Sequence, residues 1–139
     1  MRLKTRSECP FVGPAGHLLD QIIERALPPG TTYALTNLVA CFPREAKARG
    51  DNEPEPGEIA ACRPRLMEFI KLCHPRLVVL VGSLASNYIG HDAYGKVCGA
   101  SALDIIHPAA ILRMPLAQKQ MAVQKVIVVL RNAVECVLQ

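Results

Sequence analysis

The sequence predicts an α/β protein, built as three α/β/α layers around a small, mostly parallel central sheet. Three short runs of apolar and β-branched residues, at 31–40, 77–81 and 102–106, are typical of buried strands. Stretches with apolar residues at helical spacing lie before, between and after these runs. Alternation of strands with helices favours an open parallel sheet that carries helices on both faces.

The first forty residues contain one predicted helix and one predicted strand. Apolar residues recur at helical spacing from Leu18 to Ala26, and the Leu27-Pro28-Pro29-Gly30 sequence ends that helix. Residues 31–40, TTYALTNLVA, follow as a buried strand. The next segment, 41–57, is charged, contains three prolines and two glycines, and has no periodicity. It is predicted to be an exposed loop.

A second helix is predicted from Glu58 to Cys73. Pro64 lies inside it and is a potential kink, and His74-Pro75 stops it. Its predicted inward face carries the apolar residues Ile59, Cys62, Leu66, Phe69 and Ile70.

The second half of the chain repeats the alternation. The strand 77–81, LVVLV, is apolar on both faces, as in a parallel sheet that is covered by helices. A short helix is predicted from Gly82-Ser83 to Ile89, with Gly90 closing it, and residues 90–101 are glycine-rich and irregular. The third strand, 102–106, leads directly into His107-Pro108.

A long closing helix is predicted from Pro115 to Leu138. Four apolar residues are expected to point inward: Met121, Val126, Leu130 and Val134. Three cationic residues are expected to point outward: Lys119, Lys125 and Arg131.

Length and composition limit the classes of protein that fit. The 139 residues predict a single domain, 1–139, and a sequence that is 50% apolar and 20% charged excludes disorder. No apolar run approaches the roughly 20 residues of a membrane span, and the polar start MRLKTRSE lacks a signal-peptide core. A cytoplasmic location is therefore expected. The net charge of +4 permits a nucleic-acid partner without requiring one.

The six cysteines include no C-x-x-C pair. Because the cytosol keeps thiols reduced, a disulfide framework is not expected. Cys73 and Cys136 lie among apolar residues at helical spacing and are predicted to be small core residues.

Potential ligand-binding positions lie in one loop and at three predicted strand ends. In the segment PFVGPAGHLLD, Gly13 and Gly16 would let backbone N–H groups approach a phosphate or a polar ring, although taken alone the segment favours a plain loop and helix cap. In parallel sheets, ligands bind beyond the carboxyl ends of the strands. Those ends carry Thr36-Asn37 with Cys41, Gly82-Ser83, and His107-Pro108.

Five motifs in order carry a family resemblance: PFVGPAGHLLD, LTNLVAC, EIAACRPRL, LVVLVG and HPAAILR. Together they resemble the uracil-DNA glycosylase superfamily, closest to its iron–sulfur-containing family 4. The resemblance covers nearly the whole chain, and the last helix fits by position and pattern only. It implies a protein of base excision repair that acts on DNA containing uracil.

The resemblance implies roles for three residues in excising a flipped-out base. Phe11 matches the aromatic ring that stacks on uracil. Asn37 matches the side-chain amide that pairs with the O4 acceptor and the N3 donor of uracil. His107 matches the histidine that donates a hydrogen bond to the oxyanion developing on the departing base.

Four further residues are candidates for DNA phosphate contacts: Gly13, Gly16, Ser83 and Arg113. For Ser83 the sequence favours capping of its own helix over a phosphate contact, and Arg113 could equally be a solvated side chain.

The family resemblance also implies a [4Fe-4S] cluster with four cysteine ligands. Cys41 and Cys62 match two of them, whereas Cys9, the only cysteine upstream, lies where the family places no ligand. The chain therefore offers half of the expected ligand set.

The family's first strand, which ends in an acidic, water-positioning turn, has no match here. Met1 to Glu8 is too short and too polar to form it. The chain is a fragment of a longer enzyme, a degenerate member that closes its sheet directly, or a protein whose partner chain supplies the strand. The first of these is favoured.

The sequence therefore predicts a glycosylase-fold protein that recognises uracil in DNA, with hydrolysis expected only if the missing turn is supplied or bypassed. A catalytically inactive nucleic-acid-binding or interaction module is the main alternative. A small nucleotide-binding α/β protein is a third, although the chain has no Walker-type lysine or Rossmann glycine triplet.

Overall fold

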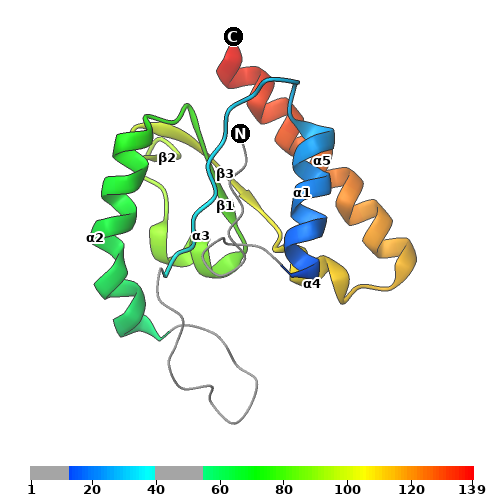
Figure 1. Cartoon of the computed structure of the whole chain (residues 1–139), viewed down its shortest axis with the longest axis horizontal. Helices are drawn as coiled ribbons and strands as arrows, with labels where there is room; N and C mark the ends of the chain where they lie inside the picture. The colour runs from blue at the N-terminus through cyan, green and yellow to red at the C-terminus, as the bar shows by residue number, and fades with distance from the viewer. Residues whose placement is uncertain (1–12, 40–54) are drawn as a thin grey trace.

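The computed structural model describes residues 13–39 and 55–139 (Figure 1). In these ranges the helices are α1 (Pro14–Ala26), α2 (Pro56–Cys73), α3 (Ser83–Ile89), α4 (Pro108–Leu112) and α5 (Leu116–Leu138). The strands are β1 (Leu77–Val81), β2 (Lys96–Val97) and β3 (Ala100–Ile105).

The strands form one sheet in the order β1-β3-β2. β1 and β3 are parallel, with Leu77 opposite Ser101 and Val81 opposite Ile105, so α3 and β2 belong to the connection between them. β2 joins the other side of β3 in antiparallel orientation. The predicted parallel pairing is thus confirmed, and the short β2 is an addition from the glycine-rich segment that was predicted to be irregular.

Local sequence explains where the helices begin. Pro14 occupies the first turn of α1, where its missing N–H has no helical partner to lose. In α2 the Glu55 backbone N–H donates to Glu58 Oε2 over 2.8 Å, which closes a capping box. α2 therefore begins at Pro56, inside the segment predicted to be loop, and continues through Pro64 as one helix of 18 residues.

The two faces of the sheet carry two separate hydrophobic clusters, as a three-layer fold requires. One cluster packs α1, α4 and α5 around Ile105, and Val79 and Leu103 contribute from the strands. The other packs α2 against Leu80 and Val97. Figure 1 shows α2 on one side of the sheet and α1 with α5 on the other. The predicted α/β fold with helices on both faces is confirmed.

The strand predicted at residues 31–40 is wrong for the described part, 31–39. This segment forms no strand there, although Leu35 packs against the first cluster and Leu38 against the second. An extended segment becomes a strand only when a neighbour accepts its backbone hydrogen bonds, and none of the ladders among the described residues includes it. Apolar, β-branched composition alone is therefore not sufficient to make this segment a strand.

Three predictions of inward-facing residues are also wrong. Met121 is 74% exposed, and Ile127 joins Val126 in the core instead. Five residues of helix rotate by about 500°, which turns Met121 well away from Val126. Cys73 and Cys136 are exposed rather than buried. Cys73 is the last residue of α2, beyond its last buried residue, Ile70.

α1 begins at Pro14, four residues before the predicted start of its helical pattern at Leu18, and α4 was not predicted. The other helix and strand predictions agree with the structure within one or two residues. β1 has its predicted bounds, and β3 begins two residues before the predicted strand. None of the helices in the described ranges is long and apolar enough to cross a membrane.

Candidate functional site

His107 lies where β3 gives way to α4 and is the N-cap residue of that helix. Its side chain caps the helix, because the Ala109 backbone N–H donates to His107 Nδ1 over 3.0 Å. The His107 carbonyl accepts from the N–H groups of Ala110 and Ile111, and Pro108 is buried at the first helical position. The His-Pro-Ala-Ala sequence thereby fixes both the backbone and the ring of His107.

The capping bond defines which tautomer the neutral imidazole adopts. Nδ1 accepts a hydrogen bond, so in the neutral ring the proton resides on Nε2. Burial lowers the pKa of His107 below its usual 6.5, and the positive charge of Arg113 lowers it further. The neutral imidazole with an Nε2–H donor is therefore the form that the site favours at neutral pH.

Gly82 packs against this imidazole from the end of β1. A Cβ atom at position 82 would lie 3.0 Å from His107 Cβ and 3.2 Å from His107 Cδ2, closer than ordinary contact. Gly82 has φ 92° and ψ 164°, a conformation open essentially to glycine only. Its N–H donates to the Ile105 carbonyl over 2.9 Å. The predicted strand ends at Gly82-Ser83 and His107-Pro108 are thus brought together.

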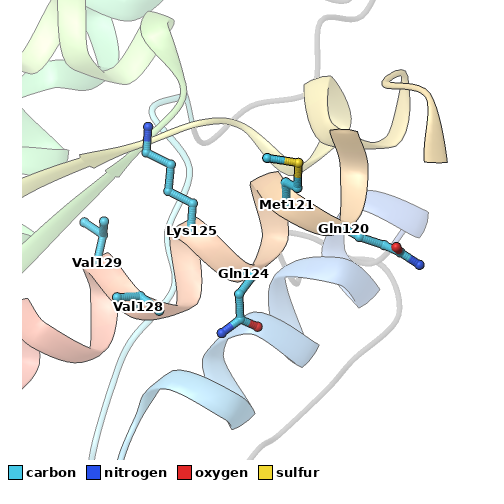
Figure 2. Close-up of a pocket in the computed structure, with 6 residues that line it drawn as sticks. All are labelled: Gln120, Met121, Gln124, Lys125, Val128 and Val129. Carbon is cyan, nitrogen blue, oxygen red and sulfur yellow. The ribbon is translucent and has the colours of Figure 1, made fainter. Parts of the chain in front are cut away.

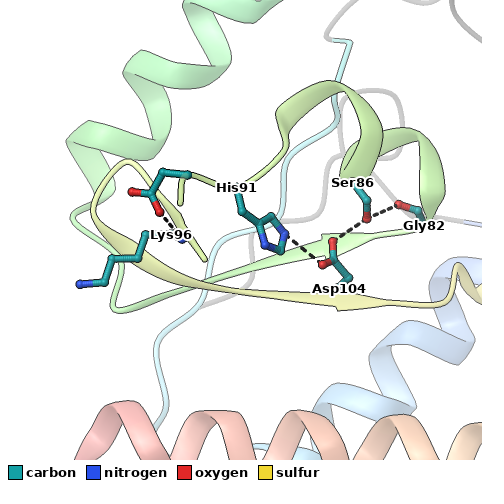
Figure 3. A network of polar contacts seen from close by, with 6 residues as sticks. Gly82, Ser86, His91, Lys96 and Asp104 are labelled. Carbon is teal, nitrogen blue, oxygen red and sulfur yellow. Dashed lines mark hydrogen bonds and ion pairs between the residues drawn. The ribbon is translucent and has the colours of Figure 1, made fainter. Parts of the chain in front are cut away.

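A polar network continues from Gly82 into the sheet (Figure 3). Ser86 Oγ lies 2.6 Å from Asp104 Oδ1 and 3.1 Å from the Gly82 carbonyl oxygen. His91 Nε2 lies 2.9 Å from Asp104 Oδ2. None of these three side chains was predicted from the sequence; the signal that could have found them was a lone carboxylate, Asp104, inside an otherwise apolar predicted strand.

The predicted phosphate contacts lie in different settings. Arg113 is exposed at the end of α4, where its Nε donates to the Ala109 carbonyl over 3.2 Å, and its charge acts on His107. Ser83 is exposed in the first turn of α3 and does not cap that helix, because Gly82 is the N-cap. Gly13 is the exposed N-cap of α1, and Gly16 is buried in its first turn.

The predicted uracil contacts are only partly described. Asn37 is exposed and lies in the chain between Leu35 and Leu38, which are partly buried and pack against the two hydrophobic clusters. Phe11 lies outside the described residues.

A shallow hollow on the described surface lies on α5 (Figure 2). It measures about 520 Å³ and is lined by Gln120, Met121, Gln124, Lys125, Val128 and Val129. None of the uracil or phosphate contacts predicted from the sequence lines it, so it is separate from the His107 site.

The described residues do not fit a complete iron–sulfur site. Cys62 is half-buried on α2, and Cys41 lies outside the described ranges. Within those ranges, no group of three or more cysteine, histidine or acidic side chains is placed to hold a metal. A [4Fe-4S] cluster usually takes four thiolates, and the described residues bring no such set together.

Comparison with known proteins identifies the family of the chain. The family model of the uracil DNA glycosylase superfamily matches residues 2–131. The type-4 uracil-DNA glycosylase of Sulfurisphaera tokodaii is 34% identical over 79% of this chain and 56% of its own length. Those of Saccharolobus solfataricus and Pyrobaculum aerophilum are 30% and 28% identical. The chain thus spans about three-fifths of the length of these relatives, and it belongs to the uracil-DNA glycosylase superfamily.

Proposed function

We propose that this protein recognises uracil flipped out of DNA and takes part in hydrolysing its N-glycosidic bond. The observation that carries the proposal is the neutral, fixed imidazole of His107. A backbone N–H occupies Nδ1, and burial with Arg113 lowers the pKa of the ring, so Nε2–H is the donor. Such a donor can stabilise an oxyanion without having to lose a proton.

In the proposed reaction, water forms a bond to C1′ of the deoxyribose as the C1′–N1 bond breaks. The electron pair of that bond leaves with the uracil, so negative charge develops on the base. We assign His107 Nε2–H the role of donating a hydrogen bond to the oxygen on which that charge develops. A fixed donor is more effective than water here because it needs no reorientation as the charge appears.

Reading of the base is proposed for Asn37 and Phe11. The exposed amide of Asn37 can accept from N3–H and donate to O4, a pattern that cytosine does not offer. Phe11 is assigned to stacking on the base. Gly13, Gly16, Ser83 and Arg113 are assigned to DNA phosphates, of which the exposed guanidinium of Arg113 is the strongest candidate by charge.

Hydrolysis further requires that the water-positioning turn missing from the motif pattern be supplied or bypassed. In the described segment 31–39, Leu35 packs against one hydrophobic cluster and Leu38 against the other, yet the segment joins none of the ladders of the described strands. We infer that a preceding segment of a longer protein, or a partner chain, completes the sheet there and brings that turn.

The test is alkali-induced strand cleavage of an oligonucleotide with one uracil. His107→Asn is the sharpest variant, because asparagine also caps helices but offers no imidazole. Asn37→Ala removes the proposed base contact at an exposed position. His17→Ala, an exposed histidine on α1, is the matched control.

Cleavage that is retained in His17→Ala and lost in the other two variants supports the proposal. Salt-sensitive DNA binding without cleavage, unchanged in His107→Asn and Asn37→Ala, would instead indicate a non-catalytic binding module.

We also propose that Cys41 and Cys62 are two of the four ligands of a [4Fe-4S] cluster. Iron and acid-labile sulfide per chain, compared between wild type, Cys62→Ser and the exposed control Cys73→Ser, test this assignment. Equal iron in all three proteins would refute it.

A further inference from the structure

We propose that Asp104, acting through Ser86, is a positioning residue that holds Gly82 against the His107 imidazole. The catalytic part of this inference rests on the proposed uracil excision, whereas its geometric part concerns His107 in the free protein. Asp104 lies on β3, three residues before His107 and opposite Leu80 of β1. It is the one carboxylate within that strand.

The first link joins Asp104 to α3. Ser86 Oγ lies 2.6 Å from Asp104 Oδ1, and a hydroxyl with one proton donates to the nearer, charged acceptor. The second oxygen of Asp104 lies 2.9 Å from His91 Nε2. Both carboxylate oxygens are therefore engaged, which fixes the orientation of a side chain that is still 46% exposed.

The second link joins Ser86 to Gly82. The Ser86 backbone N–H donates to the Gly82 carbonyl over 3.2 Å, and this bond carries the link, because the hydroxyl proton of Ser86 is given to Asp104 although Oγ lies 3.1 Å from the same carbonyl oxygen. On its other side, the Gly82 N–H donates to the Ile105 carbonyl over 2.9 Å. Gly82 is thus tied to β3 directly through its amide and indirectly through Ser86 and Asp104, the three residues seen together in Figure 3.

The third link is steric. The space that a Cβ on Gly82 would need is already limited by His107 Cβ, Cγ and Cδ2 at 3.0 to 3.4 Å. The backbone at Gly82 therefore forms a wall against the Cβ, Cγ and Cδ2 side of His107. The capping bond from Ala109 fixes the Nδ1 side of the ring, so the wall and the cap together determine where Nε2 points.

These contacts matter more for the rate than for stability. A single hydrogen bond on a half-exposed carboxylate stabilises a fold by only about 1 kcal/mol. By contrast, a misplacement of about 1 Å in a catalytic group can lower a rate about 100-fold. Loss of the Ser86–Asp104 bond should therefore lower the excision rate while the fold persists.

The test compares Ser86→Ala, Asp104→Ala and Asp104→Asn with the control Ser101→Ala, an exposed serine on the same strand. Asparagine keeps an oxygen acceptor for Ser86, so it should restore part of what alanine loses. For each folded variant, the His107 imidazole resonances and the single-turnover excision rate are measured, together with DNA affinity. If Asp104→Ala does not fold, Ser86→Ala and Asp104→Asn decide.

We expect shifted His107 resonances and an excision rate lower by about 10- to 100-fold in Ser86→Ala and Asp104→Ala, with DNA affinity within about twofold. Resonances and rates equal to those of Ser101→Ala would overturn the proposal. If the wild-type protein excises no uracil, the proposed function fails, and the His107 resonances alone decide whether Asp104 positions the ring.

Discussion

Replacing Gly82 with alanine tests the packing of the β1 end against His107. The added Cβ would lie 3.0 Å from His107 Cβ, 3.2 Å from Cδ2 and 3.4 Å from Cγ. Two of these atoms belong to a ring held by the Ala109 cap, and the third is attached to the backbone of the α4 N-cap. Relief of the contact therefore requires movement of His107 or of the residue 82 backbone.

Two terms set the magnitude. A non-glycine residue at φ 92° and ψ 164° is strained by about 1 to 3 kcal/mol. The extra methyl group against packed atoms adds about 1 to 3 kcal/mol. Together they predict a loss of about 2 to 6 kcal/mol, a large part of the roughly 5 to 15 kcal/mol by which domains are stable. At about 3 °C per kcal/mol, Tm should fall by roughly 6 to 18 °C.

The assay is thermal unfolding, with Gly30→Ala as the control. Gly30 also has a positive φ, 82°, but an added Cβ there would meet nothing within 4 Å. The control therefore carries backbone strain without a steric contact. If the two variants lose the same Tm, and the His107 resonances of Gly82→Ala match those of wild type, the packing argument is refuted.

Three further results are expected. Arg113→Gln should raise the pKa of His107, because it removes a nearby positive charge, whereas Arg131→Gln on α5 should not; an NMR titration in which both behave alike would contradict this. Because the pKa of His107 in the folded protein lies below 6.5, the unfolded chain takes up the proton first as the pH falls. The contribution of His107 to the free energy of unfolding should therefore decline as pH falls through about 6.5 and below. His107→Asn should lack this decline in denaturant titrations. Ile127→Ala should destabilise by about 2 to 5 kcal/mol, and Met121→Ala by no more than about 0.5 kcal/mol; similar losses would show that the burial of α5 is misassigned.

Much of the fold could be predicted from local patterns. β1 is a run of five apolar residues bounded by Arg76 and Gly82, and its bounds are as predicted. The closing helix was placed within one residue of its start because Pro115 marks its beginning. These elements are set by hydrophobic runs and by residues with fixed backbone preferences, which act within a few positions of the chain.

The segment 31–39 shows where local patterns fail. Its composition is that of a strand, yet pairing depends on a neighbour that composition does not specify. Met121 shows a second failure, because a helix with apolar residues on several sides does not reveal which side meets the sheet.

The candidate site likewise has a part that the sequence predicted and a part that it did not. His107 and Gly82-Ser83 were nominated as strand ends, and parallel pairing of β1 with β3 places them side by side. The roles predicted for Asn37, Phe11 and the phosphate contacts stay predictions. The link from Asp104 through Ser86 to Gly82 joins residues 18 and four positions apart, a spacing that no sequence motif encodes.

The sequence by itself determined the α/β class, the order of α2, β1, α3, β3 and α5, and the family to which the chain belongs, whereas it predicted neither β2 nor α4. Hydrophobic periodicity, helix caps and motif order are patterns of neighbouring residues, so they can be recognised in the sequence alone. Only the tertiary structure decided that Gly82 forms a wall against His107, that Nδ1 is the capped nitrogen, and that Arg113 lowers the pKa of the ring. Those facts depend on distances between segments, and such distances arise only when the strands pair and the helices pack.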